Sequence, residues 1–267
     1  MDRFGKINSI WLAHSTDGDI RFRASSGGFI KSFLCFLLDS HRIDYAIVTR
    51  TGGQENPLIP ETIVTNRKDE IISTRTNSVY CENNPFRNIN IWPGKRYAFV
   101  GLPCQIRRAR LYPNMKCVIS LICNHTPKLE FTREILDKLG VKEPDVSQIE
   151  YRGSGWPGCF AAHLKDGSTK TLSKYWSNGY MPERCRKCSE IGDNADIVTG
   201  DPWHLGLEKT DKSGSTLVIC RNQLSSQLIK KAGKYVSIKP TGRAELNKSQ
   251  GKHFRKKLRE RRTGEGN

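Results

Sequence analysis

The chain has 267 residues, a length that suits one large domain or two small ones, and its 36% hydrophobic residues exclude a disordered chain. Its 44 lysine and arginine residues outnumber its 27 acidic residues by 17, so we expect its surface to attract nucleic acid, phosphorylated cofactors, acidic proteins or anionic lipid head groups. The longest apolar run, residues 33–38, is far shorter than the ~18 residues of a membrane-spanning helix. With no signal-peptide core either, we expect a cytoplasmic protein without a membrane span.

Over the first half of the chain, apolar runs with strand character alternate with runs of helical length. The expected strands are residues 9–13, 45–49, 62–65, 97–101 and 117–123. The expected helices are residues 29–38, 67–73, a segment after residue 104 that ends at 110, and 129–139. Strands that alternate with helices predict an α/β core.

From residue 148 onward, short strands typical of antiparallel pairing become more frequent. They are expected at 149–152, 160–164, 169–172, 195–199 and 216–220, and a last helix at 223–232. The predicted fold class is α/β, with a mixed sheet core flanked by helices and a smaller antiparallel β sub-region in the second half. We divide the chain into an α/β region (1–147), a β-rich region (148–240) and a basic C-terminal tail (241–267).

Nine cysteines in a chain without an export signal favour metal binding or redox chemistry over a disulfide framework. Cys185 and Cys188 form a Cys-x-x-Cys pair whose sulfurs can be aimed at one ion, and the flanking cations favour the thiolate form. Such a pair is half of a zinc site, a redox dithiol or half of an iron–sulfur site. On this pair alone, zinc is the first candidate.

Two other cysteines follow expected strands. Cys104 comes after the strand at 97–101, and Cys123 ends the strand at 117–123. Neighbouring parallel strands would place both at the carboxyl edge of one sheet, where α/β folds usually bind ligands. Either cysteine alone could equally be a small buried side chain. Cys159, after a glycine-rich turn, is the best reserve ligand.

Three glycine-rich segments could bind a ligand or simply turn the chain. Residues 23–28, Arg-Ala-Ser-Ser-Gly-Gly, precede an expected helix, whose N terminus can hold a phosphate through backbone N–H groups. The same residues could form only a helix cap and a tight turn. Gly200 and Asp201 follow an expected strand in a similar way. Residues 152–158 combine an arginine, three glycines and a tryptophan, a composition that favours a site-lining loop, with a turn around a packed Trp156 as the alternative.

Together these segments resemble one family: the beta subunits of coenzyme F420-reducing hydrogenase and formate dehydrogenase, with relatives in bacterial surface-polysaccharide clusters and the plant hydroxymethyl chlorophyll a reductases. The resemblance runs in order from about residue 10 to residue 232. It rests on DGDIR from Asp17, RASSGG from Arg23, NSVY from Asn77, GLPCQI from Gly101, LICNHTP from Leu121, YRGSGWPG from Tyr151, RCRKC from Arg184 and ADIVTGDPW from Ala195. The order of these short motifs argues against a chance match.

The resemblance implies an FAD-binding α/β protein with a 4Fe-4S cluster close to the flavin. The implied cluster ligands are Cys104, Cys123, Cys185 and Cys188. The implied flavin neighbourhood consists of Arg23, Ser25, Ser26, Gly27, Gly28, Ser78, Tyr80, Gly101, Pro103, Gln105, Gly200 and Asp201. Residues 1–147 would then bind the flavin, and residues 148–240 would complete the iron–sulfur site.

The resulting hypothesis is an oxidoreductase that passes electrons between a two-electron donor or substrate, such as the deazaflavin coenzyme F420, and a one-electron carrier. The expected partner is an anionic redox protein, a ferredoxin or another iron–sulfur subunit, and the chain could belong to an oligomer. The chain lacks the clustered cysteines of the ferredoxin-like region that many relatives carry, and Asn124-His125 replaces the family's usual residues after the second cysteine. Use of coenzyme F420 is the least transferable feature, because only some family members use it.

Two other classes of protein remain as alternatives. One is a zinc-stabilised nucleic-acid-binding protein, suggested by the net charge and by seven basic side chains within residues 252–262. That segment has only Phe254 as a stacking side chain, so specific nucleic-acid binding is not expected. The other is a cofactor-free subunit of a redox or polysaccharide assembly.

Overall fold

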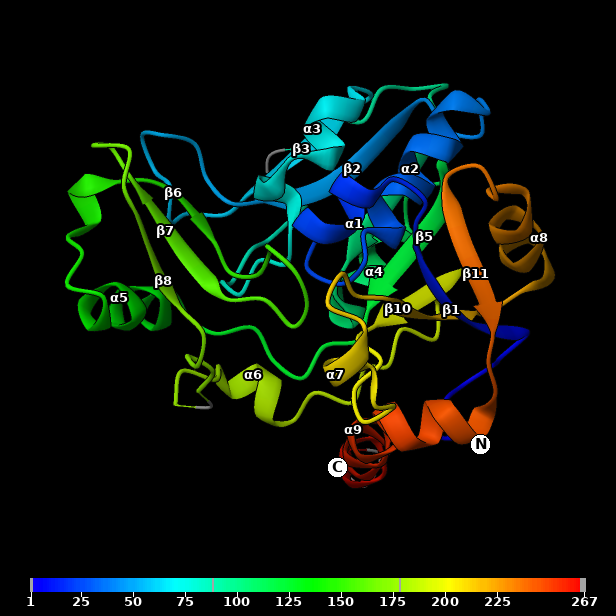
Figure 1. Ribbon diagram of the computed structural model, residues 1–267. Coiled ribbons are helices and arrows are strands. Elements are labelled where there is room, and N and C mark those ends of the chain that lie inside the picture. Colours follow the sequence, from blue (N-terminus) through cyan, green and yellow to red (C-terminus); the bar gives the residue numbers. More distant parts are fainter. Residues whose placement is uncertain (1, 88, 178, 265–267) are drawn as a thin grey trace.

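The computed structural model describes residues 2–87, 89–177 and 179–264, with side chains up to residue 261. Within these residues the strands form one sheet of eight strands and a separate sheet of three, with helices around both (Figure 1). The large sheet has the spatial order β11 (Val236–Pro240), β1 (Ser9–Ser15), β10 (Thr216–Cys220), β9 (Ile197–Gly200), β5 (Met115–Leu121), β4 (Tyr97–Gly101), β2 (Tyr45–Arg50) and β3 (Glu61–Thr65).

The centre of the large sheet is parallel. β2, β4, β5 and β9 run in the same direction, whereas β3 at one side and β10, β1 and β11 at the other pair antiparallel with their neighbours. All residues of β10 and most of β4 and β5 are buried, as expected for strands covered on both faces. Because parallel strands end at the same edge, the segments that follow β4, β5 and β9 leave the sheet together. We call this the carboxyl edge.

Helices cover both faces of the large sheet. Alternate strand residues point to opposite faces, so that in β5 Cys117 and Ile119 join one core and Val118 the other. The first core includes α2 (Phe29–Asp39) and α8 (Gln223–Lys231), and the second includes α4 (Pro103–Ala109) and α9 (Arg243–Gly264). The sheet is therefore the middle layer of three.

The small sheet consists of β6 (Val146–Glu150), β7 (Phe160–Leu164) and β8 (Thr169–Leu172), all antiparallel. It has its own core, shared with α5 (Leu129–Lys138) and centred on Phe131, Tyr151 and Phe160. In Figure 1 it lies to the left of the large sheet. The remaining short elements are α1 (Gly18–Arg23), α3 (Lys68–Ile72), η1 (Thr74–Thr76), η2 (Glu143–Asp145), α6 (Glu183–Arg186) and α7 (Leu207–Thr210).

The predicted fold class is confirmed, and three of the local differences bear on the site. The expected strand at 117–123 ends at Leu121, because the chain turns after the Ile122 N–H bonds the Thr199 carbonyl (2.7 Å), so Cys123 lies in the loop beyond it. β9 and β10 come from the second half of the chain yet belong to the large sheet. The basic segment expected as a tail contains α9, which buries Leu246 and Phe254. No helix in the described residues has the length and apolar character needed to cross a membrane.

Candidate functional site at the carboxyl edge

Cys104 lies in the first turn of α4, directly beyond the carboxyl end of β4. Pro103 begins the helix, and the Gln105 side chain accepts a hydrogen bond from the Leu102 N–H (2.8 Å). A Cβ on Gly101 would lie only 2.4 Å from the Phe99 ring, so this position requires glycine. Gly101, Pro103 and Gln105 thus shape the sharp turn that leaves Cys104 exposed at the edge of the sheet.

Cys123 lies on the neighbouring parallel strand connection, two residues after β5. Burial raises the pKa of its thiol to about 12, the Lys257 charge opposes this, and Cys104 and Cys185 raise it further. Although the residue is exposed, partial desolvation of its thiol also raises the pKa of Cys104, and Cys188 and Cys185 add to the effect. The Cys104 and Cys123 thiols therefore both feel the charge of other cysteines in the set, although Cys104 and Cys188 are 84 positions apart in the sequence.

Cys185 and Cys188 belong to a short helical turn. Cys185 lies within α6, and the Cys188 N–H points to the Cys185 carbonyl (3.5 Å). Arg184 next to Cys185 forms an ion pair with Glu82 (3.0 Å), which fastens α6 to the segment that precedes β4. Among the four predicted metal ligands, Cys104 is electrostatically coupled to Cys185 and Cys188, and Cys123 to Cys104 and Cys185. We call Cys104, Cys123, Cys185 and Cys188 the four-cysteine site.

The four-cysteine site is not shaped for a single ion. All nine cysteines are free thiols, and in the described part of the chain no three His, Cys, Asp or Glu side chains are close enough to hold one metal ion. A zinc ion needs four ligands in direct contact with it, whereas each cysteine of a 4Fe-4S cluster binds a different iron and the sulfurs surround a larger group. A donor set of four cysteines has the chemistry that such a cluster requires.

The 23–28 turn joins α1 to α2 and packs against distant backbone. Gly27 and Gly28 have positive φ angles (70° and 71°), and a Cβ on Gly27 would lie 2.6 Å from the Gly214 carbonyl oxygen. Ser25 accepts a hydrogen bond from the Ser78 N–H (2.9 Å), and Ser26 donates one to the Ser215 carbonyl (2.8 Å). The turn is therefore fixed in shape beside Ser78, another predicted flavin residue.

Arg152 connects three predicted flavin residues, and the sequence-based site does not include it. Its guanidinium forms a buried ion pair with Asp201 (2.7 Å), donates to the Ser25 carbonyl (2.8 Å) and lies 3.4 Å from the Tyr80 hydroxyl. Burial opposes the charge, but Asp201 and Tyr80 outweigh it and raise the pKa of Arg152. The sequence signals for it were its place at the start of a glycine-rich loop and within the YRGSGWPG motif of the resemblance.

The other predicted flavin residues lie around these contacts. The Arg23 side chain is half exposed and pairs with Asp19 (3.1 Å) rather than pointing into the site. Gly200 ends β9, and a Cβ there would lie 2.8 Å from Ile122, so the ends of β9 and β5 pack closely. The Asp201 carboxylate is engaged by Arg152 and by the Trp156 indole N–H (3.3 Å).

Two family models, for two parts of the same protein, match this chain. One, described as the C terminus of the coenzyme F420 hydrogenase/dehydrogenase beta subunit, matches residues 94–243, and the N-terminal part of the same subunit matches residues 10–88. The chain belongs to this family. The resemblance predicted from the ordered motifs is thereby confirmed.

Similar proteins are named as beta subunits of F420-linked enzymes. The coenzyme F420 hydrogenase subunit beta of Methanothermobacter thermautotrophicus is 26% identical over 238 residues, which cover 80% of this chain and 81% of the relative. The F420-dependent formate dehydrogenase 1 subunit beta of Methanococcus maripaludis is 27% identical over 87% of this chain, which spans only 62% of that relative. A chain of the F420-reducing NiFe hydrogenase complex of Methanosarcina barkeri shares the fold, with a TM-score of 0.68 at 22% identity over 97% of this chain and 92% of that one.

The relatives in the F420 hydrogenase/dehydrogenase beta subunit family are named as oxidoreductase subunits.

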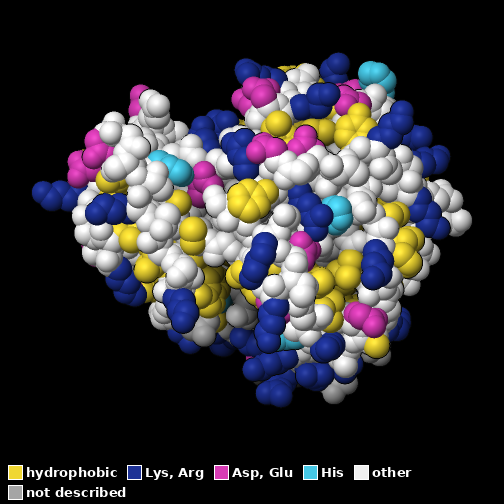
Figure 2. All heavy atoms as spheres, in the orientation of Figure 1, with side chains coloured by type: hydrophobic (Ala, Val, Ile, Leu, Met, Phe, Trp, Pro, Cys, Tyr) yellow, Lys and Arg dark blue, Asp and Glu magenta, His cyan; other side chains and the backbone are white. Residues whose placement is uncertain are grey.

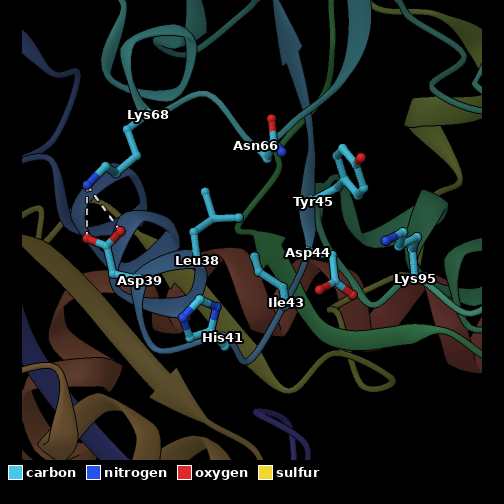
Figure 3. Close-up of a pocket in the computed structure, with 9 residues that line it drawn as sticks. All are labelled: Leu38, Asp39, His41, Ile43, Asp44, Tyr45, Asn66, Lys68 and Lys95. Carbon is cyan, nitrogen blue, oxygen red and sulfur yellow. Dashed lines mark hydrogen bonds and ion pairs between the residues drawn. The ribbon is translucent and has the colours of Figure 1, made fainter.

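Two surface cavities lie away from the predicted site. One, of about 470 Å³, lies beside the amino ends of β2 and β4, with Tyr45, Lys68 and Lys95 in its lining (Figure 3). The other lies between the N-terminal segment and α9. Neither is lined by a predicted cofactor or metal residue.

A buried lysine stabilises the 23–28 turn through hydrogen bonds that run by way of Asn77. The Lys31 ammonium donates to Asn77 Oδ1 (2.6 Å) and to the Ser73 carbonyl (2.8 Å), and the Asn77 amide donates to the Arg23 and Arg152 carbonyls (both 2.9 Å). Burial lowers the pKa of Lys31 to about 7, and both its charged and its neutral form keep N–H groups for these acceptors.

Lys31→Met is expected to lower the free energy of unfolding by about 1–3 kcal/mol, because it leaves buried acceptors on Asn77 and Ser73 without a donor. Urea denaturation followed by circular dichroism measures this change. Lys116→Met, at an exposed position of β5, is the matched control and should change stability by less than about 0.5 kcal/mol. Equal effects of the two substitutions would contradict the role assigned to Lys31.

Proposed function

We propose that this chain is an iron–sulfur flavoprotein subunit that passes electrons between a two-electron donor or substrate, such as coenzyme F420, and a one-electron carrier. The proposal is supported by the electrostatic coupling of Cys104 and Cys123, which follow β4 and β5, to each other and to the Cys185–Cys188 turn. Four thiolates are the usual ligands of a 4Fe-4S cluster. Cys104, Cys123, Cys185 and Cys188 would hold it.

The flavin would lie beside this site, against the predicted residues that Arg152 and Ser78 connect. Within the described residues, α2 begins after Gly28 without a side-chain cap, so its first N–H groups are free to meet a phosphate of FAD. Arg152 and Asp201 fix the relative positions of the 23–28 turn and the end of β9. Tyr80, which packs edge-to-face on Tyr151 (5.7 Å), would contribute an aromatic wall.

Bound together, FAD and the cluster would convert one hydride transfer into two single-electron transfers, so that the donor loses two electrons and two carriers each gain one. The side chains described above position these groups; none of them transfers electrons itself. The excess of 17 basic residues would draw anionic partners, including a ferredoxin, another iron–sulfur subunit and a deazaflavin. Figure 2 shows many of these cations gathered at the lower end of the molecule, where α9 lies in Figure 1.

Two features of the assembly and setting belong to the same proposal. The relatives are named as subunits, so this chain would also act within a larger complex. A cytoplasmic location would suit nine free thiols, because a reducing compartment keeps them from forming disulfides.

The decisive experiment is the spectrum and composition of anaerobically purified protein. We expect flavin absorption bands, a broad sulfur-to-iron shoulder, and FAD, iron and sulfide in the ratio of one flavin and one 4Fe-4S cluster per chain. Colourless protein with stoichiometric zinc would favour a zinc-stabilised protein instead, and colourless metal-free protein would favour a cofactor-free subunit. Either of the last two results would overturn the proposal.

A further inference from the structure

Helix α9 spans the carboxyl edge beside the four-cysteine site. Near its beginning, the Ser249 hydroxyl and the Gln250 amide donate to the Asp201 carbonyl (3.2 and 2.6 Å), just beyond the end of β9. Near its end, Arg261 donates to the Ser189 carbonyl (3.3 Å), next to Cys188. Both ends of this stretch of helix are therefore fastened to segments that carry predicted cofactor residues.

Lys257 lies on the face of α9 that these contacts hold against the protein. It is about two turns beyond Gln250 and about one turn before Arg261, so the three side chains share one face of the helix. Only 2% of Lys257 is exposed, which is rare for a lysine, and Phe254, one turn before it, is fully buried. Because α9 is rich in basic residues, its sequence alone does not single out Lys257 as a buried lysine.

The Lys257 side chain is held on this buried face between two anchored points, the contact of Gln250 with the Asp201 carbonyl and the contact of Arg261 with Ser189, which follows Cys188. In the described part of the chain, no carboxylate lies within salt-bridge distance of Lys257. A lysine on this face places a positive charge where an anionic group bound at the site would meet it.

A second polar side chain, two residues after Cys123, is also buried. His125 is 4% exposed and stacks on Trp176 (4.8 Å between ring centroids); its ring lies near the Ser177 backbone, but neither ring nitrogen makes a well-formed hydrogen bond in the described residues. Buried polar groups are normally satisfied. Two buried polar side chains, Lys257 of α9 and His125 of the loop after β5, thus belong to segments that border the site.

We propose that α9 brings Lys257 to the iron–sulfur cluster as a fixed positive charge that raises the reduction potential of the cluster. This rests on the proposed function. Four thiolates give the cluster a net negative charge, which grows by one on reduction, and a nearby buried cation favours the reduced form. Arg186 and Lys187 lie near the site as well, but their side chains are exposed and water screens them.

The test compares the cluster midpoint potential of Lys257→Met, Lys257→Arg and Lys256→Met, measured by redox titration with electron paramagnetic resonance. Lys257→Met keeps an unbranched side chain but removes the charge, Lys257→Arg retains the charge, and Lys256→Met removes an exposed charge one residue away. We expect Lys257→Met to reduce the equilibrium constant for cluster reduction at least tenfold, which is about 59 mV for one electron. The two other variants should shift the potential by much less.

The outcomes separate this inference from the function on which it rests. Iron and sulfide analysis of the wild-type protein comes first, and protein without a cluster would overturn both. If the wild-type protein carries a cluster, an unchanged potential in Lys257→Met overturns the role of Lys257 alone. If Lys257→Met fails to retain iron, the potential is measured in Lys257→Gln instead. If both neutral variants lose iron and Lys257→Arg keeps it, the positive charge is needed to bind the cluster, and its role in setting the potential is overturned.

Discussion

Replacing Cys185 with serine is expected to remove nearly all iron and sulfide from the protein while leaving much of its FAD bound. A serine hydroxyl is a poor substitute for the thiolate that iron–sulfur clusters require. Cys185 lies in α6, whereas the predicted flavin residues are held by Arg152 and by the 23–28 turn, so the substitution leaves their contacts intact. Iron and sulfide assays, together with the flavin released on denaturation, measure the two effects separately.

Cys159→Ser is the matched control, because Cys159 is the reserve ligand in a glycine-rich turn. Burial and Glu150 raise the pKa of its thiol, and Cys159 directly precedes β7 of the small sheet, whereas Cys104 and Cys123 follow strands of the large sheet. Cys159→Ser should therefore keep its full iron content. Retention of iron in Cys185→Ser would remove Cys185 from the ligand set. Loss of iron in Cys159→Ser would add Cys159 to it.

The position of Cys104 and Cys123 was predictable because it follows from local pattern. Each comes after an apolar run of strand length, and the pairing of β4 with β5 puts both at one edge, as expected for consecutive strands in an α/β fold. The convergence of this pair with Cys185 and Cys188 would depend on contacts between segments far apart in the sequence. The strand-end positions made Cys104 and Cys123 candidate partners of the Cys-x-x-Cys pair, and the family resemblance implied the same four ligands.

The roles of Arg152 and α9 could not be predicted from local pattern. Arginine and lysine are mostly exposed, so a sequence rich in them is expected to face solvent. Their burial here depends on distant partners: Arg152 contacts Ser25 and Asp201, and α9 is anchored through Phe254, which packs on Phe4 (5.2 Å between ring centroids). A single sequence gives no signal for such pairs, which is why the missed residues are buried cations.

Arg152→Met should lower the free energy of unfolding by about 3–5 kcal/mol and weaken FAD binding. The substitution leaves the Asp201 carboxylate buried without its cation, and this cost exceeds the net gain that the ion pair provides. The carbonyls of Ser25 and Pro157 lose their donors as well. Urea denaturation measures the stability, and equilibrium titration of FAD into the flavin-free protein measures the binding.

Arg23→Met is the matched control, since it breaks an exposed arginine–aspartate pair whose side chains are 54% and 70% exposed and should cost at most about 1 kcal/mol. The double variant Arg152→Met/Asp201→Asn removes the unpaired charge. Its cost should be smaller than the sum of the two single substitutions by about 0.5–3 kcal/mol, because the residues interact directly. Additive single effects, or an Arg152→Met cost no larger than that of Arg23→Met, would show that the pair does not hold the 23–28 turn to the end of β9.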